Sequence, residues 1–145
     1  ETDLIKLGHL YAECLLDMMR YDFFDILCHI DVIKKFGHTP LRSFMSDKTA
    51  LFAEIKKGGY AVEVNTSGYD HPVREPYPSL NILARLCEAG IPVTLGSDAH
   101  RPEDVGRYFA KTIRMVRSAG YKYLLSFDKR TRNMVLFENE DETIQ

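Results

Sequence analysis

The feature that most constrains the fold of this chain is a regular alternation of amphipathic segments with short apolar runs. The amphipathic segments place apolar residues at steps of three and four, which is typical of helices packed on one face. The apolar runs are too short for typical helices and predict buried strands. We expect helices over 3–20, from Ser46 or Asp47 to Gly58, 78–90 and 102–120, and strands over 23–31, 60–65 and 91–96. Strands alternating with helices predict an α/β fold with a parallel sheet and helical crossovers.

The end of the chain departs from this alternation. Residues 123–127 and 134–137 predict a C-terminal hairpin around a connection at 128–133. We therefore expect one unit over 1–137, followed by an acidic, solvated tail over 138–145. About three parallel strands leave two open sheet edges, which proteins normally cover. We expect the missing part of a barrel, or another chain, to cover them.

Composition narrows the class of protein. The chain has 145 residues with 45% hydrophobic and 28% charged residues and a net charge of −2, as expected for one compact domain without dedicated nucleic-acid binding. No apolar run approaches the roughly 18 residues of a membrane span, and the opening residues do not show the n-region, h-region and cleavage site of a signal peptide. Cys14, Cys28 and Cys87 lack C-x-x-C spacing, which predicts reduced, buried thiols and a cytoplasmic location. Because Glu1 opens directly into a helical pattern, we expect a truncated or processed chain.

Polar residues follow each predicted strand at the point where the strand ends. These residues come in pairs two positions apart: His29 with Asp31, Glu63 with Asn65, and Asp98 with His100. In α/β barrels the carboxyl ends of parallel strands carry the functional site. Because residues two apart in an extended chain point to the same side, we expect each pair to face one way.

The residues alone leave more than one interpretation open. Asp98 and His100 could supply a carboxylate oxygen and an imidazole nitrogen to a divalent metal, or simply form a loop with a helix cap. His29 could be a metal ligand or a hydrogen-bonded core histidine. Glu63 could line a site or face the surface, because burying it without a partner is costly.

Three ordered segments resemble motifs of the polymerase-and-histidinol-phosphatase (PHP) family. They are CHIDVIKKFG at 28–37, VEVNTSG at 62–68 and IPVTLGSDAH at 91–100. The later segments RPEDVGRYF and SAGYKYLLSFDKR resemble its histidinol-phosphatase branch. The resemblance covers nearly the whole chain, and three motifs in order at consecutive strand ends are more specific than any one of them.

The resemblance implies a fold and a reaction. The fold is a distorted seven-stranded (β/α) TIM-like barrel that holds up to three divalent ions, of zinc, manganese or iron. The reaction is metal-dependent hydrolysis of a phosphate monoester, histidinol phosphate, in histidine biosynthesis. The family's first H-x-H motif does not occur in this chain. We therefore expect the C-terminal half of the barrel, completed by a missing N-terminal half or by a second copy.

The resemblance also implies roles for particular residues. His29, Asp98 and His100 match metal ligands, and the last two are expected to be catalytic. Glu63 and Asn65 match positions that line the site and contact the substrate or support the ligands, and Arg74 is a candidate phosphate contact. Two alternatives stay open: a PHP-type nuclease or structural module beside a polymerase, and a catalytically inactive half-domain.

Overall fold

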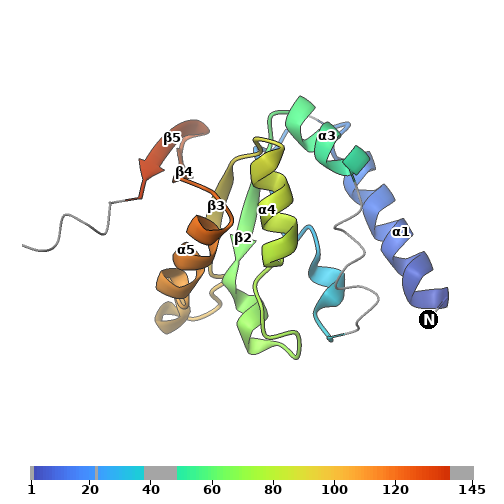
Figure 1. Cartoon of the computed structure of the whole chain (residues 1–145), viewed down its shortest axis with the longest axis horizontal. Helices are drawn as coiled ribbons and strands as arrows, with labels where there is room; N and C mark the ends of the chain where they lie inside the picture. Colours follow the sequence, from blue (N-terminus) through green and yellow to red (C-terminus); the bar gives the residue numbers. More distant parts are fainter. Residues whose placement is uncertain (1, 22, 38–48, 138–145) are drawn as a thin grey trace, which may run out of the picture.

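The computed structural model describes residues 2–21, 23–37 and 49–137, and the predicted alternation of helices and strands is present in it (Figure 1). The helices are α1 (Thr2–Met18), α3 (Thr49–Lys57), α4 (Leu80–Glu88) and α5 (Phe109–Ser118), and the strands are β1 (Ile26–Leu27), β2 (Ala61–Asn65), β3 (Val93–Gly96), β4 (Tyr123–Asp128) and β5 (Thr131–Leu136). Short 3-10 helices lie at Val32–Lys34, Thr66–Asp70 and Pro102–Asp104.

The three-stranded sheet is parallel throughout, in the order β1-β2-β3. The central strand β2 is covered on both faces: Val62 and Val64 are buried on one side, and Ala61 and Asn65 are buried on the other, which also carries Glu63. This double burial is typical of a parallel sheet covered by crossover helices. The α/β class with about three parallel strands and a C-terminal hairpin is therefore confirmed.

The core lies between the sheet and the helices that connect its strands (Figure 1). Helix α3 contributes Leu51 and Ile55, and α4 contributes Ile82 and Leu86, all of them buried. Their spacing of four residues within each helix places both members on one face. This packing fixes the sheet, so the carboxyl ends of β1, β2 and β3 lie at one edge.

The hairpin of β4 and β5 is fastened to the opposite end of the sheet. The Arg130 guanidinium donates to the Asp25 carboxylate, just before β1, at 2.7 Å, and Arg132 donates to the Gly59 carbonyl before β2. The predicted connection at 128–133 is wrong: the strands run to Asp128↔Thr131 and turn on two residues of positive φ, Lys129 and Arg130. Such two-residue turns match the twist of the flanking strands.

Two predicted elements are shorter than expected. The strand predicted over 23–31 pairs only at Ile26–Leu27, because the chain turns at His29, with φ 59°, and enters a 3-10 helix after Asp31. The helix predicted over 102–120 is interrupted. It begins as a 3-10 turn and restarts at Phe109, since Gly106 and Tyr108 both take left-handed backbone angles.

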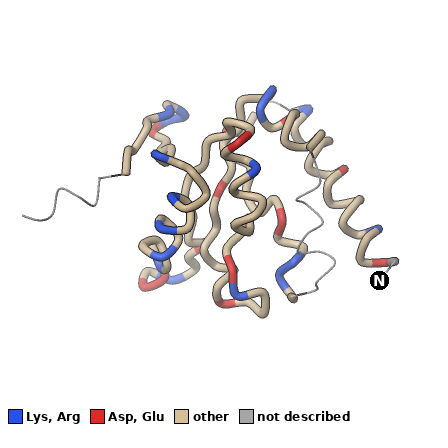
Figure 2. Tube along the Cα trace, viewed as in Figure 1, with Lys and Arg blue, Asp and Glu red and all other residues tan. Residues whose placement is uncertain are grey.

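Further predictions concern the cysteines, the helix cap, the C-terminal tail and membrane spans. The cysteine prediction was wrong on burial, because Cys14 and Cys28 are exposed and Cys87 is half-buried. The helix cap expected at 46–47 and the tail at 138–145 lie outside the described residues. Among the helices described, none combines the length and apolar character needed to cross a membrane. Along the chain trace, Lys and Arg positions and Asp and Glu positions are spread over the described elements, and Lys and Arg recur along α5 (Figure 2).

Candidate functional site

The carboxyl ends of β1 and β2 bring three of the predicted site residues into contact. The His29 Nε2 atom lies 3.5 Å from Glu63 Oε2 and 3.1 Å from Asn65 Nδ2. Asn65 Nδ2 also donates to Glu63 Oε2 at 3.1 Å. Glu63 and Asn65 therefore face the same side of the sheet, as their spacing predicted, and His29 reaches them from the neighbouring strand.

A hydrogen-bond chain continues from Asn65 to the end of β3. The Asn65 Oδ1 atom accepts from the Ser67 backbone N–H at 2.9 Å and from the Ser67 hydroxyl at 2.7 Å. The same hydroxyl lies 3.2 Å from Asp98 Oδ2. Since a hydroxyl carries one hydrogen, Ser67 shares it between the Asn65 carbonyl and the Asp98 carboxylate. His29, Glu63, Asn65 and Asp98 thus belong to one connected set.

The Glu63 side chain packs closely against a glycine on the next strand, Gly96. A Cβ atom on Gly96 would lie 1.9 Å from Glu63 Oε1, so only glycine leaves room for this carboxylate. Glu63 also accepts a hydrogen bond from the Cys28 thiol. Desolvation raises the pKa of the Cys28 thiol to about 12, and the charge of Glu63 contributes. Cys28 is therefore a neutral thiol beside the carboxylate.

The predicted pairing of His29 with Asp31 is wrong. Because the backbone turns at His29, the two side chains part, and Asp31 is fully buried away from the site edge. Its Oδ2 atom lies 2.7 Å from the buried Lys34 ammonium and accepts from the Ser79 N–H at 3.0 Å. Desolvation raises the pKa of the Asp31 carboxyl, while Lys34 opposes this shift. His29 instead stacks near the Tyr77 ring, with ring centroids 6.3 Å apart.

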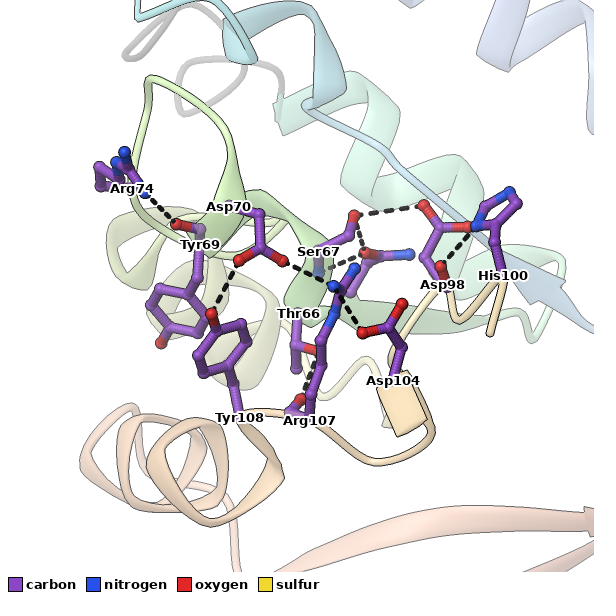
Figure 3. Close-up of polar contacts among 11 residues, drawn as sticks. Thr66, Ser67, Tyr69, Asp70, Arg74, Asp98, His100, Asp104, Arg107 and Tyr108 are labelled. Atoms are coloured by element: carbon purple, nitrogen blue, oxygen red, sulfur yellow. Dashed lines mark hydrogen bonds and ion pairs between the residues drawn. The ribbon is translucent and has the colours of Figure 1, made fainter. Parts of the chain in front are cut away.

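Asp98 and His100 are held at the end of β3 by local contacts. Asp98 takes a left-handed backbone angle, φ 51°, and the His100 Nδ1 atom lies 2.8 Å from the Asp98 carbonyl (Figure 3). Because a carbonyl only accepts, Nδ1 carries a hydrogen and the Nε2 atom of neutral His100 keeps its lone pair. His100 is exposed, so this lone pair can reach a ligand from outside the chain.

A second polar network joins the loops after β2 and β3. The Tyr108 hydroxyl donates to Asp70 at 2.7 Å, and Arg107 Nη1 lies 3.0 Å from Asp70 and 3.2 Å from Asp104 (Figure 3). The Thr66 hydroxyl donates to the Arg107 carbonyl. These contacts hold the loop that follows Asp98 against the loop that follows Asn65, and they explain why Tyr108 keeps its left-handed backbone.

Arg74 lies apart from Asp98 and His100. Its guanidinium donates to the Tyr69 carbonyl at 3.2 Å, on the far side of the drawn network from Asp98 (Figure 3). The predicted roles of Arg74, Glu63 and Asn65 in substrate binding stay predictions. In the geometry described here, the Asn65 amide uses both of its donors and both acceptor positions on protein partners.

The donor atoms fit divalent metals in kind but form only part of a site. Imidazole and carboxylate groups suit zinc, manganese and iron. Within the described ranges, however, no three His, Cys, Asp or Glu side chains converge closely enough to hold an ion. His29 and Asp98 are linked through Asn65 and Ser67 rather than through direct contact. Further ligands are needed to complete a coordination sphere.

Sequence reasoning missed two residues that this arrangement uses. Ser67 carries the link from Asn65 to Asp98, and Asn followed two residues later by Ser is a pattern typical of an Asx turn. That signal was available in the sequence. The role of Gly96 was not, because it depends on the cross-strand approach of Glu63. The interloop contacts of Arg107 also join segments too distant in sequence to be predicted.

Comparison with known proteins finds similarity to a PHP-associated family and to proteins named as histidinol-phosphatases. The PHP_C family, described as PHP-associated, matches residues 84–118. A protein of Deinococcus radiodurans named "Probable histidinol-phosphatase" is 36% identical over 125 residues, which cover 83% of this chain and 45% of that protein. A protein of the same name from Thermotoga maritima is 26% identical over 121 residues, covering 82% of this chain and 51% of that protein.

A solved structure shows the same fold. The crystal structure of hisK from Listeria monocytogenes, described as a "putative histidinol phosphatase", superposes with a TM-score of 0.63 and 27% sequence identity. The match covers 72% of this chain and 43% of that one. This chain spans about half the length of the relatives it matches.

Proposed function

Because this chain belongs to the PHP family, as the C-terminal part of its histidinol-phosphatase branch, we propose that it carries part of the active site of a metal-dependent phosphatase for histidinol phosphate. One observation supports this most directly. His29, Glu63 and Asp98 come from the ends of three neighbouring parallel strands and belong to one hydrogen-bonded set. That is the edge at which α/β barrels assemble their active sites.

In this proposal His29, Asp98 and His100 hold divalent ions, of zinc, manganese or iron, with up to three in a complete domain. Bound there, the ions supply Lewis acidity to the phosphoryl group and to the attacking water. Asp98 holds its carboxylate toward the site while Ser67 donates to it. His100 presents Nε2, since its Nδ1 atom is engaged by the Asp98 carbonyl.

Arg74 is the proposed phosphate contact, through a planar guanidinium that suits phosphate oxygens. To reach a phosphate beside Asp98, its side chain has to leave the Tyr69 carbonyl. The proposed substrate is small, because the relatives are named for a small phosphorylated substrate. The cytoplasmic location and the place in histidine biosynthesis stay predictions.

The surface of α1 supports the proposal that more polypeptide completes the barrel. Leu7, Leu10 and Met18 are 48%, 58% and 38% exposed, and with the exposed Cys14 they form a stripe at steps of three and four. Ala12 and Leu15 on the same helix are buried against the core. We propose that the exposed stripe packs against polypeptide equivalent to the half of the relatives that this chain does not match.

The test combines metal content with phosphate release from histidinol phosphate. In the complete protein, we expect His100→Ala to lower turnover by orders of magnitude at saturating manganese or zinc, because one ligand is lost. His9→Ala, a change of an exposed histidine on α1, is the matched control and should leave turnover unchanged. Near-normal turnover in His100→Ala would refute this assignment.

Two other outcomes separate the alternatives. Preferential cleavage of single-stranded DNA over histidinol phosphate would favour the nuclease interpretation. Less than one metal equivalent per chain, with no turnover, would assign the reaction only to a complete barrel. That result would make the 145-residue chain an inactive half-domain.

A further inference from the structure

The structure assigns to Asn65 the role of a positioning residue that sets which nitrogen of His29 carries the proton. We infer that the buried Asn65 amide holds neutral His29 as its Nδ1–H tautomer, with the Nε2 lone pair accepting an amide hydrogen until a ligand displaces it. The orientation of the amide, the position of the imidazole and a second histidine with the same preference support this inference.

The orientation of the Asn65 amide follows from its partners. The Ser67 backbone N–H can only donate, and it lies 2.9 Å from the atom assigned as Oδ1. The Glu63 carboxylate accepts from the opposite end of the amide at 3.1 Å. Exchanging the amide oxygen and nitrogen would set two donors against each other at Ser67 and two acceptors against each other at Glu63. Only one orientation satisfies both contacts.

This orientation determines the state of His29. Asn65 Nδ2 has two hydrogens, of which one goes to Glu63 and the other points at His29 Nε2, 3.1 Å away. A nitrogen that faces a donor at this distance has to accept, so Nε2 carries a lone pair and the proton of the neutral ring is on Nδ1. The alternative, an Nε2–H donated to Glu63 Oε2, has a separation of 3.5 Å, longer than ordinary N–H···O bonds.

Burial makes the arrangement rigid. Asn65 is fully buried, and its backbone exchanges two hydrogen bonds with Tyr77 at 2.7 and 3.0 Å. The Tyr77 ring stacks near the imidazole of His29 with an interplanar angle of 23°. Asn65 is therefore itself the hydrogen-bond partner of His29, and its backbone also holds Tyr77, the stacking partner of His29. This limits rotation of the ring and keeps Nε2 toward Glu63 and Asn65.

His100 shows the same preference by a different route. Its Nδ1 atom donates to the Asp98 carbonyl, which leaves Nε2 with a lone pair. Both histidines predicted as ligands are thus prepared as Nδ1–H tautomers before any ion is bound. In His100 the partner holds the nitrogen opposite the free lone pair, which is the usual way in which surrounding residues prepare a histidine for metal binding. In His29, Asn65 contacts Nε2 itself, so an ion that binds there has to displace the Asn65 hydrogen bond.

The tautomer can be measured on the 145-residue chain without metal or substrate. Long-range proton–nitrogen correlation spectra of the chain labelled with ¹⁵N, with chelator present, report which ring nitrogen carries hydrogen. The five histidines are assigned by single His→Gln changes. We expect protonated Nδ1 and unprotonated Nε2 for His29, and a coupling across the hydrogen bond between Asn65 Nδ2 and His29 Nε2. An Nε2–H signal for His29 in the unmodified chain would overturn the inference.

Two variants separate positioning from a general structural role. Asn65→Leu has nearly the same shape but no donor, so Nε2 should gain the proton and donate to Glu63. Ser67→Ala is the matched control: it removes the hydroxyl contact but keeps the backbone N–H that orients the amide. Its His29 tautomer should not change. An unchanged tautomer in a folded Asn65→Leu protein would contradict the inference. If that variant does not fold, the coupling in the unmodified chain decides.

The link to metal binding rests on the proposed function and is tested separately. Addition of zinc should shift the His29 Nε2 resonance and abolish the coupling to Asn65 Nδ2, because the ion displaces that hydrogen bond, while Nδ1 keeps its hydrogen. If zinc leaves His29 unaffected although the Nδ1–H tautomer is observed, the metal role fails and the positioning role stands. If phosphate release is found but His29 carries its proton on Nε2, the inference fails and the proposed function stands.

Discussion

Replacing Lys34 with methionine should destabilise the fold strongly, because Lys34 neutralises a fully buried carboxylate. The Lys34 ammonium is fully buried, 2.7 Å from Asp31 Oδ2, 3.2 Å from Glu75 Oε1 and 2.9 Å from the Pro76 carbonyl. Methionine keeps most of the aliphatic volume but leaves the Asp31 carboxylate without a cation. Removing one partner of a buried ion pair typically costs about 3–5 kcal/mol of unfolding free energy.

The expected change can be measured by urea denaturation. A loss of about 4 kcal/mol with a slope of about 2 kcal/mol per molar urea corresponds to a midpoint lower by about 2 M. This is a large part of the roughly 5–15 kcal/mol that stabilises a typical domain. The matched control is Arg20→Met, which removes an exposed pair with Asp17 whose side chains are 79% and 67% exposed. Exposed pairs contribute about 0–1 kcal/mol, so this midpoint should hardly move.

The pH dependence gives the same prediction a second test. In Lys34→Met, the group that lowers the pKa of Asp31 is gone, and desolvation, which raises it, remains. A carboxyl whose pKa is higher in the folded state destabilises the fold as pH rises above its unfolded value of about 3.9. The difference between variant and unmodified chain should therefore be largest near pH 7 and shrink toward pH 4. A loss below about 1 kcal/mol at pH 7, or a difference independent of pH, would refute the reasoning.

Two further predictions concern the surroundings of Glu63. Gly96→Ala should destabilise the chain by about 1–3 kcal/mol, because the new Cβ would meet Glu63 Oε1. Adding Glu63→Ala should recover much of that loss in the urea midpoint, and additive losses would contradict the proposed clash. Cys28 should react with iodoacetamide at pH 8 about two to three orders of magnitude more slowly than free cysteine, because its pKa is raised to about 12. Measured in a chain with Cys14→Ser and Cys87→Ser, the rate should rise when Glu63→Gln removes the neighbouring charge, and a rate equal to that of free cysteine would contradict the assignment.

The sequence predicted the elements of the fold better than their ends. Helices α3 and α4 have apolar residues at helical spacing and glycines after their last turns, so their existence is a local property. The ends of β1 and α5 are different. Both depend on left-handed backbone angles at His29 and Tyr108, which local sequence does not predict for such residues.

The site was predictable in part for the same reason. Glu63 and Asn65 share a face because strand periodicity requires it, and the sequence predicted this correctly. The same rule failed for His29 and Asp31, where the chain is no longer extended. Periodicity therefore identified candidates at each strand end but could not say which of them point into the same space.

The sequence by itself determined the order of helices and strands and the positions of polar residues at three strand ends. These are local properties, set by the spacing of apolar residues and by residue chemistry. Only the tertiary structure decided the contacts of those residues: Asn65 against His29, Glu63 against Gly96, and Asp31 against Ser79. The physical reason is that hydrogen-bond direction and close packing depend on how separate strands and loops are placed, and that placement is fixed by burial of the common core.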